Sequence, residues 1–258
     1  MTVILVTGAT GQVGVPTAAA LRAAGHEVRA LSRHAGPGLT VADLLSGGRD
    51  AAAARGESDG AVDAAFAGVD TVVHLATTNG RRDVQLAQTV FDASRRAGIQ
   101  NLVLISIVGI EHLPVDFYRQ RVEIERRLLG SGLPHTIQRA TQFHSLVERL
   151  FTAQRFSPVF VAPALRFQPI DVGEVALKLA ALAPAGPQGR MPDIGGPEQL
   201  TARQIGRSWA RSVGSRRPVV GVRLPGRTFA ALGAGYNFVP GEPYGRITFA
   251  EYLAARRP

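Results

Sequence analysis

The feature that most constrains this chain is a glycine-rich loop between an apolar run and a helical pattern at the N-terminus. Thr2–Val6 has the composition of a buried strand, and Gly14–Ala24 has apolar residues at helical spacing. The loop Thr7–Gly14 joins them and carries three glycines. In order, these permit a tight turn, a close approach of backbone to a pyrophosphate, and close packing of helix on strand. The spacing therefore predicts a dinucleotide-binding unit with its phosphates at the helix N-terminus.

Short apolar runs and helical stretches keep alternating to about residue 140, which is typical of βαβ units and a parallel sheet. The expected strands are Thr2–Val6, Glu27–Leu31, Leu39–Leu44, Thr71–Leu75, Asn101–Ile107 and Thr136–Arg139. The expected helices are Gly14–Ala24, Arg49–Ala67 with a loop at 56–60, Arg82–Ala97, Val115–Leu129, Asp171–Leu182, Ala202–Val213 and Ile247–Ala255. This order predicts an α/β fold, a Rossmann-like doubly wound parallel sheet with a small C-terminal substrate-binding elaboration. We expect residues 1–150 to form the NAD(P)-binding region and residues 151–258 a substrate-capping region of the same domain.

Composition excludes several classes of site and partner. The absence of cysteine excludes disulfides and thiolate chemistry, and no two of the six histidines have a zinc-binding spacing, so we expect no metal. The net charge of +9 comes from arginines that are spread along the chain, which argues against nucleic-acid binding. No run of 18 apolar residues and no signal-peptide pattern is present, so we expect no membrane contact and a cytoplasmic protein.

The end of the second expected strand indicates which dinucleotide is bound. An acid about 20 residues after the glycines would bind the ribose 2′-hydroxyl of NAD, whereas an arginine there accepts the 2′-phosphate of NADP. Ser32 and Arg33 stand here without a carboxylate, which predicts NADPH; an ordinary solvated arginine is the alternative. The other cofactor contacts that we expect are Thr7, Gly8, Thr10, Gly11, Gln12, Val13 and Gly14 in the loop, Asp43 and Leu44 toward the adenine, and Leu75, Ala76 and Thr77 beneath the adenosine and ribose.

Four further segments accompany the glycine loop. They are Asp70–Ala76, Ser106–Gly109, Arg139–Phe143 and Gln168–Val172. Together these motifs resemble an atypical short-chain dehydrogenase/reductase of the NmrA-like, NAD(P)H-binding family, over essentially the whole chain. The resemblance implies that Ser106, Arg121 and Thr141 also contact the cofactor.

The chain departs from that family's catalytic pair. Short-chain dehydrogenases typically use Tyr-x-x-x-Lys, and Phe117 and Arg121 stand at the two positions here. The single lysine, Lys178, follows Glu174 by four residues, so the motif occurs nowhere in the chain. Phenylalanine has no proton to donate and arginine stays charged, so neither is a general acid. Arg121 either binds the nicotinamide ribose or pairs with Glu125 along its helix.

Four residues remain as catalytic candidates: Ser106, Tyr118, Arg121 and His144. Ser106 ends a strand and can orient a carbonyl, although no base makes it a nucleophile. Tyr118 offers a phenol, but on a helix it points about 100° away from Phe117, and packing is its alternative role. His144 has an ordinary pKa near neutrality; a capping or surface histidine is the alternative. The substrate contacts that we expect are Ile107, Phe117, Gln142 and Phe143.

Three functions stay open at this point. The first is an NADPH-dependent reductase of a quinone or a conjugated enone, because hydride transfer needs chiefly orientation and water can protonate the product. The resemblance suggests the same, since some NmrA-like relatives without the tyrosine reduce quinones or dyes. The others are a non-catalytic NADP(H)-sensing regulator and a redox-neutral isomerase or dehydratase. Phe229, Tyr236 and Phe238 favour an aromatic small-molecule substrate unless they belong to the core, and we expect a monomer or homodimer.

Overall fold

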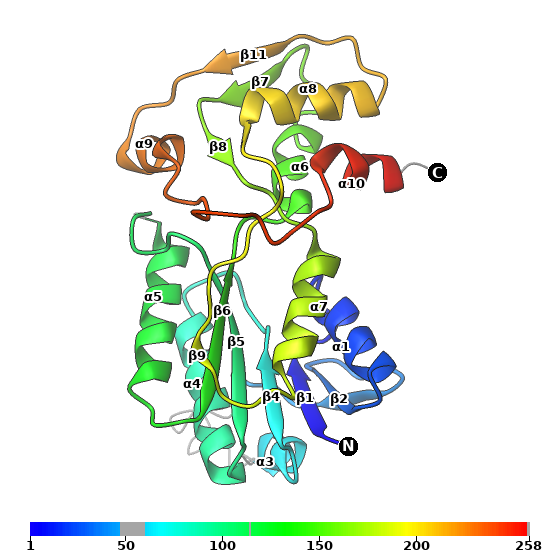
Figure 1. Ribbon diagram of the computed structural model, residues 1–258, viewed down its shortest axis with the longest axis vertical. Helices are drawn as coiled ribbons and strands as arrows, with labels where there is room; N and C mark the ends of the chain where they lie inside the picture. The colour runs from blue at the N-terminus through cyan, green and yellow to red at the C-terminus, as the bar shows by residue number, and fades with distance from the viewer. Residues whose placement is uncertain (47–59, 114, 257–258) are drawn as a thin grey trace. The chain divides into compact units, whose positions relative to one another are not determined.

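The computed structural model describes residues 1–46, 60–113 and 115–256 of the chain (Figure 1). These residues group into two compact units, each drawn from three stretches of sequence. Unit 1 comprises Met1–Ser106, Arg119–Gln138 and Val175–Met191, and unit 2 comprises Ile107–Tyr118, Arg139–Glu174 and Pro192–Pro258. These compact units interleave along the chain, and the functional division expected at residue 150 stays a prediction.

Unit 1 is built around a seven-stranded sheet with the strand order β3-β2-β1-β4-β5-β6-β9. Its strands are β1 (Val3–Thr7), β2 (Glu27–Ser32), β3 (Leu39–Val41), β4 (Thr71–His74), β5 (Asn101–Ile107), β6 (His135–Ala140) and β9 (Gly189–Arg190). β1 pairs in parallel with both β2 and β4, so the winding direction reverses at β1. This arrangement confirms the predicted Rossmann-like α/β sheet, and ligands of such sheets bind beyond the carboxyl ends of the strands at the reversal.

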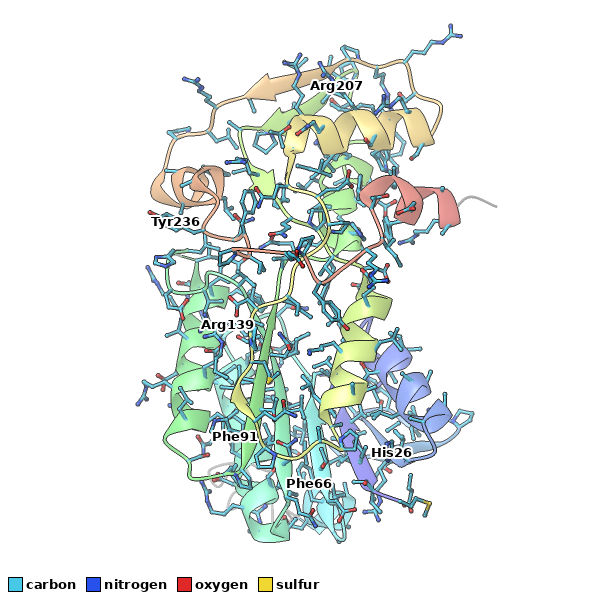
Figure 2. The ribbon with its side chains drawn as sticks, in the orientation of Figure 1. His26, Phe66, Phe91, Arg139, Arg207 and Tyr236 are labelled. Carbon is cyan, nitrogen blue, oxygen red and sulfur yellow. The ribbon has the colours of Figure 1, made fainter. Side chains whose placement is uncertain are left out.

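Helices connect the strands of unit 1 and cover its sheet. They are α1 (Gly14–Ala23), α3 (Gly60–Phe66), α4 (Asp83–Ala97), α5 (Asp116–Leu129) and α7 (Val172–Leu182). The helix expected over 49–67 is described only from Gly60 onward, since residues 47–59 lie outside the described part. Phe66 and Phe91, labelled in Figure 2, are fully buried with Leu5 and Leu102 in one apolar cluster. That cluster fixes the strands whose ends carry the candidate site.

Unit 2 has a separate apolar core, to which its helices and two small sheets contribute. Its helices are α6 (His144–Thr152), α8 (Ala202–Ser212), α9 (Arg227–Ala234) and α10 (Phe249–Ala255). The sheets pair β7 (Phe160–Pro163) in parallel with β11 (Val219–Val222), and β8 (Arg166–Phe167) antiparallel with β10 (Leu200–Thr201). The Trp209 ring is perpendicular to Phe160 at 5.0 Å and stacks on Phe151 at 6.3 Å. These aromatic contacts join α8 to α6 and β7.

Helices α8 and α10 agree closely with the predicted ranges, and each begins with a capping box. Thr201 and Gln204 exchange hydrogen bonds at the start of α8, and Thr248 and Glu251 do the same at the start of α10. Helix α6 was not predicted: Phe143 stands at its N-cap and provides no side-chain cap. The predicted third strand is shorter than expected, because pairing with β2 stops at Val41.

Within the described ranges, no helix is long and apolar enough to span a bilayer. The same residues contain no group of three or more histidine, aspartate or glutamate side chains arranged to hold a metal ion.

Candidate functional site

The glycine loop of unit 1 lies between the end of β1 and the start of α1, and its geometry requires glycine at two positions. Gly8 has a φ of +67°, and a Cβ there would lie 2.7 Å from the backbone nitrogen of Ala76. A Cβ on Gly14 would lie 2.1 Å from the carbonyl oxygen of Gly8. The loop is therefore pressed against the chain that follows β4. No acidic residue and no side-chain cap occupies the first turn of α1, so this helix end suits an anion.

A cavity of about 200 Å³ opens beside this loop, within unit 1. Ten of the predicted cofactor residues line it: Gly8, Thr10, Gly11, Ser32, Arg33, Asp43, Leu44, Leu75, Ala76 and Thr77. Thr78, which follows Thr77 in the same predicted segment, also lines the cavity, and five further residues complete the lining: Leu31, His34, Ala42, Leu45 and Leu86. The other predicted loop residues, Thr7, Gln12, Val13 and Gly14, lie outside the lining. The cavity thus joins the loop to the ends of β2, β3 and β4, where the adenosine part of a dinucleotide binds in this fold.

Backbone turns at the ends of β2 and β3 present the side chains that distinguish one dinucleotide from another. The backbone N–H of His34 donates to Ser32 Oγ at 3.1 Å, which shapes the segment that carries Arg33. Arg33 is exposed and pairs with no acid in the described part of the chain. The Asp43 carboxylate accepts a hydrogen bond from the Leu45 N–H at 2.9 Å, an Asx turn that fixes the β3 end. The end of β2 therefore offers a cation and no carboxylate to the ribose of a bound dinucleotide.

Behind the loop, a buried pair ties β1 to β4. Thr7 Oγ1 accepts weak hydrogen bonds from the N–H groups of Leu75 and Ala76, at 3.2 and 3.3 Å. Its own proton is then directed to His74 Nδ1, 2.8 Å away, which places the ring hydrogen of His74 on Nε2. Burial, assisted by the nearby positive charge of Arg121, lowers the pKa of His74 to about 3. The His74 ring is therefore neutral at physiological pH and serves as a structural acceptor.

We expect the free energy of unfolding to decrease as the pH falls below 6.5, the pKa of a histidine in the unfolded chain. The pKa of His74 drops from 6.5 to about 3 on folding, so between these values the unfolded chain binds the extra proton. Going from pH 7 to pH 5 should cost about 2 kcal/mol of unfolding free energy through this residue. Urea unfolding of the protein and of His74→Asn, which keeps an acceptor but cannot ionise, measures the difference. The exposed residue His34 provides the control His34→Asn; equal pH slopes for all three proteins would exclude this role of His74.

A second buried network lies at the chain that follows β4. Asp83, the first residue of α4, accepts hydrogen bonds from the Thr78 N–H and Oγ1, both at 2.6 Å, and from Thr77 Oγ1. The Arg121 guanidinium lies 3.1 Å from the same carboxylate, and both side chains are almost fully buried. Burial raises the pKa of the Asp83 carboxyl, but the threonine hydrogen bonds and the Arg121 charge hold it below its usual range. The ion pair thus fixes the segment of Thr77 and Thr78 that lines the cavity.

Two predicted catalytic residues lie in unit 1. Arg121 projects from α5 into the ion pair with Asp83, a partner that the sequence did not indicate. Its contact with the nicotinamide ribose stays a prediction. Ser106, at the carboxyl end of β5, is 3% exposed, and its Oγ has no hydrogen-bond partner in the described part of the chain. A buried hydroxyl without a partner is costly, so its position suits a hydrogen bond to a bound ligand.

The remaining candidates lie in unit 2. Tyr118 packs edge-on against Phe117, with ring centres 5.8 Å apart. Burial raises the pKa of its phenol, and the neighbouring Gln142 side chain opposes that shift. Thr141 is buried and donates its hydroxyl proton to the Gln168 carbonyl, while Ile107 and Phe143 are partly buried. The structure thus brings Tyr118 and Gln142 together, and their contact with substrate stays a prediction.

His144 has the surroundings of a core histidine. Its ring stacks on Tyr252 at 5.0 Å and lies 5.7 Å from the ring of Phe249. Nε2 donates to the Ile247 carbonyl at 3.0 Å, and burial lowers the pKa of the ring. These contacts hold α10 against α6, which gives His144 a structural role. Its role in proton transfer stays a prediction.

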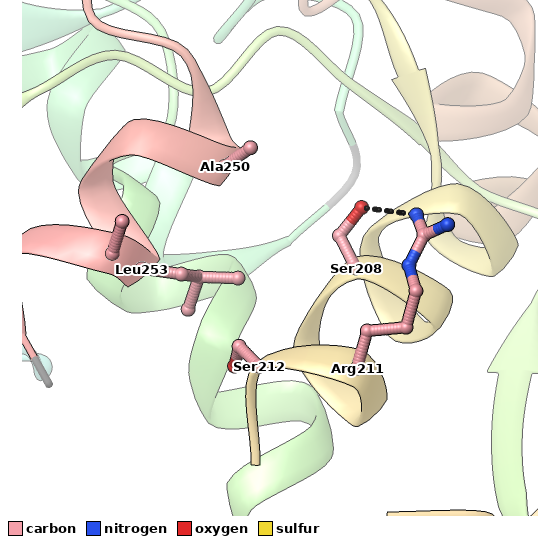
Figure 3. A pocket seen from close by; sticks show the side chains of 6 residues that line it. Ser208, Arg211, Ser212, Ala250 and Leu253 are labelled. Carbon is pink, nitrogen blue, oxygen red and sulfur yellow. Dashed lines mark hydrogen bonds between the residues drawn. The ribbon is translucent and has the colours of Figure 1, made fainter. Parts of the chain in front are cut away.

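A second cavity, of about 280 Å³, lies between α8 and α10 in unit 2 (Figure 3). Its lining residues are Ser208, Arg211, Ser212, Ala250, Leu253 and Ala254. Arg211 donates to Ser208 Oγ at 3.4 Å along α8. The lining contains neither a carboxylate nor a phenol, so it offers no group for proton transfer.

The comparisons with known proteins agree with this geometry. A family described as NAD(P)H-binding matches residues 8–150. The chain is 33% identical over 224 residues, 82% of its length and 74% of the relative's, to (4-alkanoyl-5-oxo-2,5-dihydrofuran-3-yl)methyl phosphate reductase of Streptomyces griseus. Among solved structures, the NADPH-dependent quinone oxidoreductase of Escherichia coli in complex with NADPH superposes with a TM-score of 0.79 at 18% identity, over 98% of this chain and 99% of that one. A nucleoside-diphosphate-sugar epimerase of Staphylococcus aureus also gives 0.79, at 14% identity over 98% and 99%.

Proposed function

Because the chain belongs to the NAD(P)H-binding family of atypical short-chain dehydrogenases/reductases, we propose that it binds NADPH and reduces a conjugated enone with it. The observation that carries the cofactor assignment is the cavity of unit 1. It joins the glycine loop to Arg33 at the end of β2, and the carboxylate in the lining, Asp43 at the end of β3, accepts a hydrogen bond from the Leu45 N–H. The tight glycine loop, where a Cβ at Gly8 or Gly14 would collide with backbone, also fits a bound dinucleotide, as does the buried Ser106 hydroxyl, which has no hydrogen-bond partner among the described residues.

The relative from Streptomyces supports an enone as the substrate class. The compound in its name has a ring double bond conjugated to a lactone carbonyl and to an alkanoyl group. Such a double bond accepts hydride at its β-carbon, and the enolate that forms takes a proton from water. This chemistry needs no tyrosine acid, which agrees with Phe117 at the position of the usual phenol. Two more specific substrates fit the same proposal: an enone that carries a phosphate ester, and a quinone.

In this mechanism NADPH supplies the hydride, and the residues of the chain hold and orient the reactants. Arg33 binds the 2′-phosphate, and the loop amides at the start of α1 bind the pyrophosphate. The ion pair of Asp83 and Arg121 holds Thr77 and Thr78 in place along the cavity. Ser106 orients a ligand oxygen at the end of β5. Hydride transfer depends chiefly on how the protein binds and orients the two reactants.

Kinetic selectivity between the two nicotinamide cofactors tests the proposal. With an acyl-substituted dihydrofuranone as substrate, Arg33→Ala should lower kcat/KM for NADPH by about tenfold or more, since it removes a charged hydrogen bond of about 1.5–3 kcal/mol. The value for NADH should change less than about twofold, because NADH has no 2′-phosphate. Arg33→Lys, which keeps the charge, is the matched control and should fall between. Equal losses with both cofactors would remove the assigned role of Arg33.

The same assay separates the two alternative functions. A nucleotide sensor would bind NADPH without oxidising it in the presence of dihydrofuranones or quinones. A redox-neutral isomerase would convert substrate with no net loss of NADPH; an epimerase is among the solved structures with this fold. The proposal expects one NADPH to be oxidised for each double bond reduced.

A further inference from the structure

The cavity between α8 and α10 in unit 2 has one polar wall and one apolar wall (Figure 3). Its α8 side carries Ser208, Arg211 and Ser212, whereas its α10 side consists of one leucine and two alanines. The volume of about 280 Å³ is at the lower end of the range for small-molecule sites. The cavity therefore has room for a small organic molecule with one polar end and one apolar end.

Two neighbouring residues of α8 supply hydrogen-bond donors to the polar wall. Arg211 donates to Ser208 Oγ at 3.4 Å, so the serine oxygen accepts and its own proton is directed elsewhere. No residue in the described part of the chain accepts that proton. A guanidinium has five N–H donors, so Arg211 can bond to Ser208 and to a ligand at the same time. The pair suits a ligand that offers acceptor oxygens and negative charge.

The charge along α8 favours a ligand with two negative charges. Arg203, Arg207 and Arg211 follow one another at intervals of four residues, so they lie on one face of the helix, and all three are exposed. Helix α8 has no acidic residue, and Glu251, the acid of α10, accepts hydrogen bonds from the N–H and the hydroxyl of Thr248. In such a field a phosphate monoester, with about two charges above its second pKa near 6, gains about twice as much as a carboxylate.

We propose that this cavity binds a small alkyl phosphate, with Arg211 and Ser208 on the phosphate oxygens and the α10 wall against the hydrocarbon. The leucine and the alanines remove alkyl surface from water, which distinguishes an ester from free phosphate. The lining contains no carboxylate, phenol or histidine, so the site binds its ligand without proton transfer. It involves side chains of unit 2 alone and is independent of the proposed reductase function.

Calorimetric titration of the full chain with butyl phosphate at pH 8, where the phosphate is doubly charged, tests this site. We expect butyl phosphate to bind at least about fivefold more tightly than inorganic phosphate, which has no alkyl group. The same margin is expected over pentanoate, which has the same alkyl group and a single charge. Arg211→Ala should weaken the binding of butyl phosphate by about tenfold or more, and Ser208→Ala by about threefold or more.

Two other arginines provide matched controls. Arg207→Ala removes the same charge one turn earlier on α8, outside the lining, and should change the affinity by less than about twofold because exposed charges are screened. Arg33→Ala removes the arginine of the cavity in unit 1 and should leave the affinity unchanged. Trp209, the single tryptophan of the chain, is 5% exposed in the core of unit 2. An unchanged emission maximum therefore shows that an α8 variant is folded.

Equal affinities for butyl phosphate and inorganic phosphate would overturn the proposal, because the alkyl group would then have no site. Undiminished binding of butyl phosphate by folded Arg211→Ala would overturn it as well. Equal losses in Arg211→Ala and Arg207→Ala would show a general attraction to arginines and no defined site. A loss in Arg33→Ala without one in Arg211→Ala would assign the phosphate to the cavity of unit 1 instead.

Discussion

Replacement of Asp83 by alanine should lower the free energy of unfolding by about 3–5 kcal/mol, the range for breaking a buried ion pair from one side. The variant removes the carboxylate that lies 3.1 Å from the buried Arg121 guanidinium, and Thr77 and Thr78 lose their shared acceptor. Urea unfolding at pH 7, followed by circular dichroism, measures the loss. Because Thr77 and Thr78 line the cavity, NADPH affinity should fall as well.

Two comparisons identify the buried ion pair as the cause. Asp92 pairs with Arg95 on the exposed face of the same helix, so Asp92→Ala should cost less than about 1 kcal/mol. The double variant Asp83→Leu with Arg121→Met removes both charges and should be more stable than Asp83→Ala by itself. If Asp83→Ala cost no more than Asp92→Ala, the network would not hold this part of unit 1 together.

Replacement of Gly14 by alanine should weaken NADPH binding by about 100-fold, or about 2.7 kcal/mol. The new Cβ would lie 2.1 Å from the Gly8 carbonyl oxygen, so the loop must move, and its amides leave the phosphates. Alanine favours the helix by about 1 kcal/mol, but overpacking against backbone costs about 1–3 kcal/mol and outweighs that gain. Calorimetric titration with NADPH checks the result.

Gly221→Ala is the matched control, since no atom lies within 4 Å of a Cβ at that position. It should bind NADPH as the wild-type protein does. Gly11→Ala is an intermediate case, because its Cβ would lie 3.1 Å from the same Gly8 oxygen. Undiminished NADPH binding by Gly14→Ala would show that the loop does not hold the phosphates in the expected way.

The parts of the fold that sequence predicts well are those with strong local patterns. The strands β1, β4 and β5 of unit 1 consist mostly of apolar residues, and α8 and α10 have capping boxes. Helix α6 lacks a side-chain cap, and β8 and β10 have only two residues each. None of these three elements has a local sequence pattern strong enough to predict it. Short elements of this kind form because of the tertiary contacts around them.

The candidate site divides in the same way. The residues that line the cavity follow strand ends, and the carboxyl ends of parallel strands meet at one edge, so their convergence follows from the pattern. The pairing of Asp83 with Arg121 joins residues 38 positions apart, and that of Gln142 with Asn237 joins residues 95 apart. No local spacing indicates contacts of this range. For His144 the sequence indicates proton transfer because a histidine ordinarily has a pKa near neutrality; the structure adds a stacking contact with Tyr252, and the catalytic role stays a prediction.

The central claim is that this chain transfers hydride from NADPH to the β-carbon of a conjugated enone. The most direct test is to incubate the protein with NADPH that carries deuterium at the transferred position and an acyl-substituted dihydrofuranone, and to locate the label in the product by mass spectrometry and NMR. We predict one deuterium at the β-carbon and one NADPH oxidised for each product molecule. Oxidation of no NADPH, or formation of a product without deuterium, would contradict the account.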